Sequence, residues 1–181
     1  MAKHLMIDME TMAFSPTAVV LSLGAVHFNP YGNGYGDKIY FKIDLDDQDK
    51  LNREIDPNTL EWWGKQDPAI MEEAFSEEGR IPLVDAMDQF HKFAWGCDAF
   101  WSHGSIFDLN ILDTYYRKLN KAPPWNYWQI RDTRTLFDIG KVKLTDGGYS
   151  TSHKALEDCD RQVAVVEMAY KKLMAVGLGQ K

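Results

Sequence analysis

The sequence predicts an α/β fold in which helices cover both faces of a mixed sheet. Three observations indicate this class. The first segments along the chain are rich in Val, Ile, Leu, Phe and Tyr and are separated by turn-forming residues. From about residue 56, helical patterns alternate with short apolar segments, and a long amphipathic pattern follows them. Three antiparallel-type strands followed by helix, strand, helix, strand and helix are typical of such a layered sheet.

The first three strands are expected at residues 3–9, 19–28 and 38–43. The connection between the second and third, NPYGNGYGD, has three glycines at alternate positions. A phosphate-binding loop needs a helix after it, whereas a strand follows here. We therefore interpret this connection as a hairpin loop.

Helices are expected next. Asp56 is suited to cap a helix that has Pro57 at its first position and Gly64 just past its end. Pro68 and Pro82 are placed to open two more helices. The second of these has an apolar stripe with a period near 3.6, formed by Leu83, Met87, Phe90, Phe93 and Ala94.

The second half of the chain alternates strands and helices. A short buried strand is expected at 98–102, a helix at 106–119 and a strand near 129–133. Trp125 and Trp128, in the intervening APPWNYW loop, are expected to pack in the core. A short helix to Gly140, a glycine-bearing loop at 145–150 and a long helix at about 153–176 complete the pattern.

Length and composition indicate one globular domain over residues 1–181. A chain of 181 residues buries about 70% of its extended surface on folding, so it needs no disulfide framework. Cys97 and Cys159 are expected to remain thiols in a reducing compartment. An early carboxylate and the lack of a long apolar run predict a cytoplasmic protein without membrane contact.

The net charge of −7 argues against a non-specific nucleic-acid binder held by phosphate neutralisation. The charge is unevenly distributed, however. Residues 1–90 carry 7 Lys/Arg and 17 Asp/Glu, whereas residues 91–181 carry 13 and 10. Eight basic residues against three acids lie in 117–154. This run either lines a phosphate track beside an acidic half or forms an ordinary solvated surface.

Asp8 and Glu10 lie two residues apart on the first expected strand, so their side chains project from the same face. No other Asp-x-Glu occurs in the chain. Two acids among apolar neighbours are costly unless a partner or a metal compensates them. The alternative is a strand end that reaches solvent.

Three further residues are candidates. Asp108 follows an expected strand and heads an apolar helical stripe, although its spacing from Ser105 also fits a helix-capping box. His153 and Asp158 form His-x4-Asp at the opening of the last expected helix. That spacing is weak evidence by itself. His153 follows a Gly/Ser/Thr loop, however, and this position suits a mobile histidine.

Converging carboxylates suit Mg²⁺ or Mn²⁺, because hard divalent cations prefer oxygen ligands. Two such ions about 3.5 to 4 Å apart stabilise the attacking and leaving oxygens of phosphodiester hydrolysis. A histidine, with an ordinary pKa of about 6.5, can take the proton of the attacking water near neutral pH. The candidate residues therefore indicate a nuclease.

The order of these motifs resembles that of the DEDDh 3′-to-5′ exonucleases of the RNase H-like superfamily, particularly stand-alone exonucleases of phages and prophages. The resemblance covers about residues 3–175, including LMIDMET, TLEWWGKQ, FWSHGSIFDLNIL, PPWNYWQIRDTRTL and HKALEDCDRQV. It implies a five-stranded mixed sheet whose first three strands are antiparallel.

The resemblance also implies a metal-dependent activity that removes nucleoside 5′-monophosphates from 3′ ends of single-stranded DNA or RNA, with two Mg²⁺ or Mn²⁺ ions as cofactors. Asp8, Glu10 and Asp158 would hold the first ion, and Asp8 would also reach the second. Asp108 would help to hold the second ion, and His153 would be the general base.

Substrate contacts are expected from five residues, Met9, Thr11, Trp62, Trp63 and His103. Related proteins more often have an amide where this chain has His103, and Asp where it has Glu157, and neither is a catalytic position. Adjacent helical residues point about 100° apart, so at most one of the two tryptophans can stack on a base, and the other belongs to the core.

Two alternative functions remain open at this stage. One is a nucleic-acid-binding module on the same fold without turnover. The other is endonucleolytic cleavage of RNA in hybrids, which needs a similar metal site. A monomer and a homodimer are both compatible with the sequence.

Overall fold

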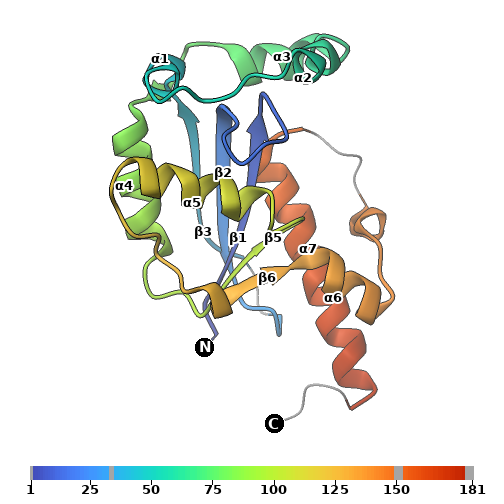
Figure 1. Cartoon of the computed structure of the whole chain (residues 1–181). Helices are drawn as coiled ribbons and strands as arrows, with labels where there is room; N and C mark the ends of the chain where they lie inside the picture. The colour runs from blue at the N-terminus through green and yellow to red at the C-terminus, as the bar shows by residue number, and fades with distance from the viewer. Residues whose placement is uncertain (1, 33–34, 149–152, 178–181) are drawn as a thin grey trace.

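The computed structural model describes residues 2–32, 35–148 and 153–177. A six-stranded sheet in the order β4-β3-β2-β1-β5-β6 lies at its centre (Figure 1). The strands are β1 (His4–Thr11), β2 (Val20–Phe28), β3 (Tyr35–Ile43), β4 (Arg80–Ile81), β5 (Ala99–Ser102) and β6 (Ile130–Asp132). The helices are α1 (Leu45–Asp49), α2 (Pro57–Trp63), α3 (Pro68–Phe75), α4 (Leu83–Ala94), α5 (Asp108–Lys118), α6 (Thr133–Gly140) and α7 (Ala155–Ala175), with short 3-10 turns η1 (Tyr127–Gln129) and η2 (Leu144–Gly147).

The sheet is mixed, and the prediction that its first three strands run antiparallel is confirmed. β2 pairs antiparallel with both β1 and β3, whereas β1, β5 and β6 run parallel to one another. Strand β1 is therefore central and has a neighbour on each side. This arrangement places the end of β1 next to the loops that follow β5 and β6.

The predicted count of five strands is wrong by one. Strand β4, Arg80–Ile81, pairs parallel with the end of β3 and forms one edge of the sheet. Two residues are too few to show the alternation by which a strand is recognised in a sequence. The Arg80 guanidinium strengthens this edge by donating to the carbonyl oxygens of Ile43, Ala74 and Leu21.

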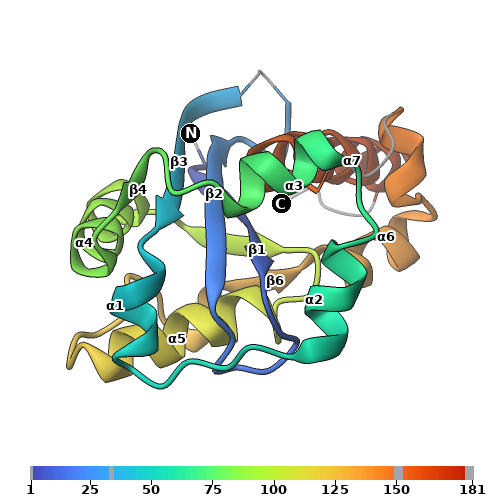
Figure 2. The same ribbon diagram turned by 90° about the horizontal axis from the view of Figure 1, so that it is seen from above.

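Helices cover both faces of the sheet, as Figure 2 shows from above. On β1, Leu5 and Ile7 belong to the larger core, which includes buried residues of α4 and α5. Met6 belongs to a second core, which includes residues of α6 and α7. Because side chains alternate along a strand, Asp8 and Glu10 share the α7 side with Met6.

Helix α2 follows the predicted pattern closely. Asp56 caps it by accepting from the Asn58 backbone, Pro57 is its first residue, and Gly64 is its C-cap. With α3, it packs a third small core beside the end of β1, and this core contains Trp63. This position brings α2 close to the acids of β1.

Two helix starts and one additional helix differ notably from the predictions. Helix α5 begins at Asp108 rather than 106, and α7 begins at Ala155 rather than 153. His153 lies outside α7 with a φ of 50°, a left-handed conformation that does not continue a helix. Helix α1 was not predicted, because its sequence LDDQD lacks an apolar stripe.

The APPWNYW loop contains one core residue rather than two. Trp125 is buried against Phe90, Phe100 and Tyr116, as predicted. Trp128 is exposed, so its predicted packing role is wrong. It lies in the short turn η1, where its ring contacts only the exposed Tyr127 among the aromatic residues described.

Cys97 and Cys159 are both buried free thiols. Within the described residues, no helix combines the length and the apolar character needed to cross a membrane. Part of the glycine-bearing loop predicted at 145–150 forms η2, and residues 149–150 lie outside the described residues.

Candidate active site

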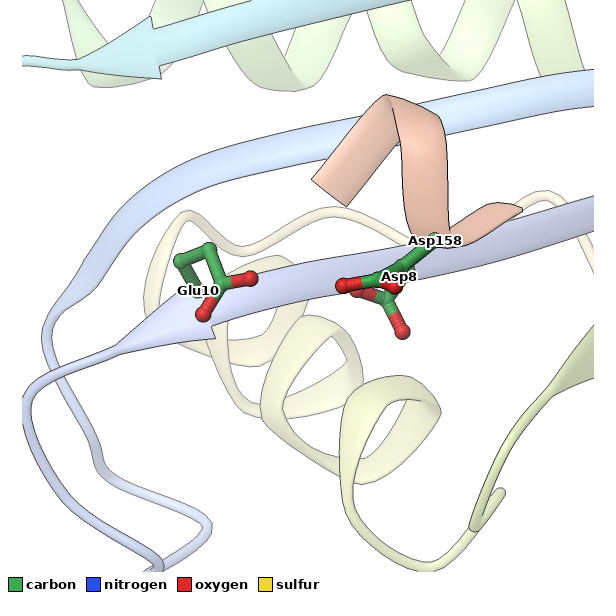
Figure 3. A group of neighbouring side chains, drawn as sticks. All are labelled: Asp8, Glu10 and Asp158. Atoms are coloured by element: carbon green, nitrogen blue, oxygen red, sulfur yellow. The ribbon is translucent and has the colours of Figure 1, made fainter. Parts of the chain in front are cut away.

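Three acids from opposite ends of the chain meet above the centre of the sheet. Asp8 and Glu10 come from β1, and Asp158 comes from the first turn of α7 (Figure 3). One carboxylate oxygen from each lies within 4.8 Å of the others. Such a set of oxygen atoms can share one cation.

A glycine on the neighbouring strand makes this approach possible. Gly24 of β2 is the register partner of Asp8, and a Cβ built on it would lie 2.6 Å from the backbone nitrogen of Leu156. The start of α7 therefore rests directly on the backbone of β2. Asp158, two residues further on, is consequently held close to Asp8.

Asp108 lines the same cleft but is not one of the three acids whose oxygens lie within 4.8 Å of one another. It is the first residue of α5 and is buried, and the helix cap at Phe107 has no side-chain hydrogen bond. The Ser105 backbone N–H instead donates to Asp132. The capping-box interpretation of Asp108 is therefore wrong, and its carboxylate faces the other acids.

The acids alter one another's protonation. Burial, followed by the charges of Asp108, Glu10 and Asp158, holds the pKa of Asp8 well above its usual range. Burial and the neighbouring charges of Asp158 and Asp108 raise the pKa of Glu10 to about 8. Burial raises the pKa of Asp108 to about 7 against the opposing effect of Ser102 and nearby backbone N–H groups.

The raised pKa values of these acids indicate whether the site suits a metal ion. Without a cation, burial and mutual repulsion disfavour the charged forms of Asp8, Glu10 and Asp108, as their raised pKa values show. A divalent cation removes that penalty by replacing the protons. The donors are all oxygens, which suit Mg²⁺ or Mn²⁺ rather than Zn²⁺.

Two neighbours on α7 hold the acids in place, and the sequence analysis did not assign them this role. The Gln162 amide donates a 2.7 Å hydrogen bond to Asp8. Arg161 forms a 2.8 Å ion pair with Asp158, and both side chains are buried. Their positions three and four residues after Asp158, on the same helical face, are the sequence signal that points to them.

His153 approaches the cluster from the segment before α7. Its ring lies edge-on to that of Trp62, with 4.9 Å between the ring centroids, and it lines the same cleft as the four acids. A positive φ outside the helix places it there. The histidine is thus positioned next to the carboxylates without taking part in helix α7.

The cleft has a volume of about 400 Å³. Its lining includes all ten site residues named from the sequence: Asp8, Met9, Glu10, Thr11, Trp62, Trp63, His103, Asp108, His153 and Asp158. It also includes Phe14 and Phe107, which the sequence analysis did not name, and Arg134, which the sequence analysis counted only within the basic run at 117–154. Their signal is weak, because each lies in a loop or at a helix start without a periodic pattern.

The two tryptophans differ, as the helical angle between them requires. Trp63 is 1% exposed, and its indole N–H donates to the Thr11 carbonyl oxygen. Trp62 is 41% exposed and faces the cleft beside His153. Trp63 therefore supports the end of β1, while Trp62 offers an open aromatic face.

The residues that follow β5 and β6 form another part of the cleft wall. His103 lies 2.7 Å from the Thr133 hydroxyl through its Nδ1 atom. The Arg134 guanidinium packs on Gly104, where an added Cβ would lie 2.4 Å from its Nη1 atom. Gly104 has a φ of +116°, which favours glycine in any case.

The basic run at 117–154 does not form one continuous track. Arg134 lines the cleft, but Lys121 pairs with Asp88 and Lys141 pairs with Asp138. Part of the run is therefore an ordinary surface of ion pairs.

Comparisons with known proteins identify the family and the fold of this chain. The 3′-5′ exoribonuclease Rv2179c-like domain matches residues 3–170. A search of curated proteins finds no match.

Among solved structures, E. coli exonuclease I in complex with a dT13 oligonucleotide matches with a TM-score of 0.74 and 14% identity over 98% of this chain. Exonuclease I from Methylocaldum szegediense matches with a TM-score of 0.68 and 13% identity over 98% of this chain. In both cases the match covers 43% of the other protein, so this chain spans less than half of its length.

Proposed function

Since this chain belongs to the Rv2179c-like 3′-5′ exoribonuclease domain family, we propose that it is a 3′-to-5′ exonuclease that removes nucleoside 5′-monophosphates from single-stranded nucleic acids. The observation that carries the proposal is the convergence of Asp8, Glu10 and Asp158 within 4.8 Å. Residues 1–181 act as one exonuclease domain in this proposal. The phage type stays a prediction from the resemblance, and a homodimer stays one of the two oligomeric states compatible with the sequence.

The proposal assigns the acids to two divalent cations. Asp8, Glu10 and Asp158 would hold one, and Asp8 with Asp108 would hold the other. When bound, Mg²⁺ or Mn²⁺ supplies Lewis acidity that activates water and stabilises the charge of the scissile phosphate and leaving oxygen. Gln162 fixes the orientation of Asp8, and Arg161 fixes that of Asp158.

His153 is assigned the proton transfer. It lines the cleft with the acids and has no backbone role in α7. In the proposed mechanism it accepts the proton of the attacking water, a task suited to an imidazole near neutral pH. Its contact with Trp62 holds the ring at the edge of the site.

A single-stranded substrate is favoured by the cleft and by the structural neighbours. The exposed face of Trp62 can stack on a terminal base, an interaction that tolerates any sequence. E. coli exonuclease I structures contain dT13 and dA16 oligonucleotides. Both DNA and RNA enter the test below, because the family is described as an exoribonuclease while these neighbours hold DNA.

The direct test uses 5′-labelled single-stranded DNA and RNA, matched duplexes, and single strands blocked by a 3′-phosphate. With Mg²⁺ or Mn²⁺, we expect the single strands to shorten one nucleotide at a time from the 3′ end. The blocked strands should be degraded more slowly. Internal cuts irrespective of the block would instead support endonucleolytic cleavage.

The silent binding module is separated from the exonuclease by turnover. A module without activity would bind the labelled strands but release no mononucleotide in a single-turnover assay with either metal. The retained set of four acids argues against it, because buried acids without a metal are costly.

A further inference from the structure

His103 is the second histidine of the active-site cleft, and the proposed function assigns it no task. It directly follows Ser102, the last residue of β5, and lines the cleft together with the four acids. Strand β5 runs parallel to β1, so the carboxyl ends of the two strands lie at the same edge of the sheet. The sheet itself therefore brings His103 next to the acids, whereas His153 comes from the segment before α7.

Helix α6 fixes the orientation of the His103 ring. Thr133 and Phe137 lie four residues apart on this helix and so share one of its faces. The Nδ1 atom of His103 lies 2.7 Å from the Thr133 hydroxyl, and its ring packs against that of Phe137 with 5.8 Å between the centroids. Both residues of α6 are buried. The ring is thus held by two buried side chains.

The buried hydroxyl decides which ring nitrogen of His103 carries the hydrogen. Among the described residues, Nδ1 of His103 is the one hydrogen-bond partner of the Thr133 hydroxyl, and Thr133 is 0% exposed. If Nδ1 carried the hydrogen, the hydroxyl would accept it and its own hydrogen would have no acceptor, which is costly in the interior. The hydroxyl therefore donates to Nδ1, and Nε2 carries the hydrogen of the neutral ring.

The Nε2–H group lies on the ring edge that the protein leaves open. No residue in the described part of the chain forms a hydrogen bond with Nε2, and the residue lines the cleft. Burial, the charge of Arg134 and then that of Arg161 lower the pKa of His103 against the opposing charge of Asp132. His103 therefore offers the cleft a hydrogen-bond donor that carries no positive charge.

A neutral donor suits a site that binds cations. A positively charged side chain at this position would repel the two divalent cations that the proposed function assigns to the acids. An uncharged N–H group still stabilises a negatively charged oxygen, and it does not compete with the cations for the carboxylates. The anionic group that the cations bring into this cleft is the phosphate of the scissile bond.

We propose that the Nε2–H group of His103 donates a hydrogen bond to a non-bridging oxygen of the phosphate whose bond is cleaved. The inference rests on the proposed function, because the cations held by the acids fix the position of that phosphate. Thr133 is then a positioning residue, since its hydroxyl holds the ring in the required tautomer. In this tautomer Nε2 has no free lone pair, so His103 cannot take the proton of the attacking water. The two histidines of the cleft therefore have different tasks.

The tautomer is measured by two-bond hydrogen–nitrogen correlation spectra of metal-free protein labelled with nitrogen-15 histidine. The spectrum of His103→Gln identifies the signals of His103 by their absence. We expect a neutral ring with its hydrogen on Nε2 in wild type, and a mixture of both tautomers in Thr133→Val, which lacks the hydroxyl. A wild-type ring with its hydrogen on Nδ1 would overturn the proposal. An unchanged tautomer in Thr133→Val would overturn the role of Thr133.

Single-turnover hydrolysis in Mn²⁺ tests the contact with the substrate. His103→Gln keeps an N–H donor at a similar reach, and His103→Phe keeps a planar ring without a donor. His91→Phe is the control, because His91 lies on α4 outside the cleft. His103→Phe should lower the rate by about 10- to 100-fold, the loss typical of a hydrogen bond to a charged oxygen. His103→Gln should stay within about fivefold of wild type, and His91→Phe should equal wild type.

The sugar of the substrate distinguishes the phosphate from the other acceptor nearby. DNA and RNA strands share the phosphate, so His103→Phe should lower the rate on both by the same factor. A loss confined to RNA would place the contact at a 2′-hydroxyl and overturn the proposal. Full activity of His103→Phe on both strands would overturn it as well.

Product binding separates this inference from the proposed function. The nucleotides 5′-CMP and 5′-dCMP are titrated into labelled wild type in Ca²⁺, and the nitrogen-15 shift of His103 Nε2 is followed. Both should move this shift, because both carry the phosphate. If neither moves it while oligonucleotides are hydrolysed, the contact fails and the exonuclease stands. If both move it but no oligonucleotide is hydrolysed in Mg²⁺ or Mn²⁺, the contact stands and the exonuclease proposal fails.

Discussion

Gly24 on β2 lies opposite Asp8 on β1, and the backbone of Leu156 at the start of α7 rests on it. A Cβ at position 24 would come within 2.6 to 2.9 Å of the backbone of Ala155 and Leu156. The distance between β2, the neighbour of the first strand, and the last helix is therefore set by the absence of a side chain at position 24. That distance also decides whether Asp158 reaches Asp8.

Gly24→Ala is expected to push the start of α7 away from the sheet. Overpacking of this kind costs about 1–3 kcal/mol of folding free energy, and a shift of about 1 Å at the acids lowers kcat by about 100-fold. Gly64→Ala is the control, because its added Cβ meets only atoms at 3.5 Å or beyond. Thermal unfolding and nuclease assays measure both variants. Normal activity in Gly24→Ala would contradict the geometric argument.

His153→Ala tests the general base. The variant should still bind Mn²⁺ and oligonucleotide, while kcat near pH 7 falls by a factor of about 10² to 10⁴. The pH dependence of the rate should differ between wild type and the variant, because the variant lacks the group that accepts the proton. The pH–rate profiles of the two proteins are the measurement. Profiles of the same shape would assign the proton transfer to another group.

Trp62→Ala and Trp63→Ala separate binding from packing within one helix. Trp63 is in the core and bonds the Thr11 carbonyl oxygen, so its removal should cost about 3–5 kcal/mol of stability. Trp62 is open to the cleft, so its removal should raise KM for single strands while the unfolding midpoint changes little. Urea unfolding and steady-state kinetics check both. Equal stability losses would show that Trp62 is also structural.

The stability of the metal-free protein should depend on pH. Glu10 has its folded-state pKa raised from 4.5 to about 8, so the folded state holds more protons than the unfolded state between these values. Its contribution is complete below about pH 4.5 and is lost as the pH rises to about 8. Asp8 and Asp108 act in the same direction.

Metal-free protein should therefore unfold at a lower temperature at pH 8 than at pH 6, and Mn²⁺ should restore more stability at pH 8. Glu10→Gln should stabilise the metal-free protein at pH 8 by on the order of 2 kcal/mol. It should also reduce the increase in stability that Mn²⁺ produces. Calorimetry at both pH values tests this. A stability that rises with pH without metal would contradict the electrostatic description.

Much of the fold follows from local patterns in the sequence. The helix at Pro57–Trp63 was predicted to within a residue because Asp56, Pro57 and Gly64 are strong local signals. Strand β4 could not be predicted, because Arg80–Ile81 depends on pairing with a distant strand. His153 was assigned to the last helix by periodicity, but its backbone is left-handed. Such a conformation depends on tertiary contacts that spacing does not reveal.

In the candidate site, too, some features follow from local sequence patterns and others depend on tertiary contacts. Asp8 and Glu10 were recognisable as a pair because a strand puts alternate residues on one face. Their meeting with Asp158 was only an implication of a family resemblance, since 150 residues of sequence separate Asp8 from Asp158. The support from Arg161 and Gln162 and the close approach at Gly24 required coordinates. Each depends on how α7 lies across the sheet.

The central claim is that acids of the first strand and the last helix share a metal ion. Calorimetric titration of Mn²⁺ into wild type, Asp158→Asn and Asp160→Asn tests it most directly. Asp160 lies on the same helix but pairs with Lys38 at 2.6 Å, so it is a matched control. We predict that Asp158→Asn weakens Mn²⁺ binding by at least about tenfold, as Asp8→Asn also does, while Asp160→Asn binds like wild type. Wild-type affinity in Asp158→Asn would contradict the shared site.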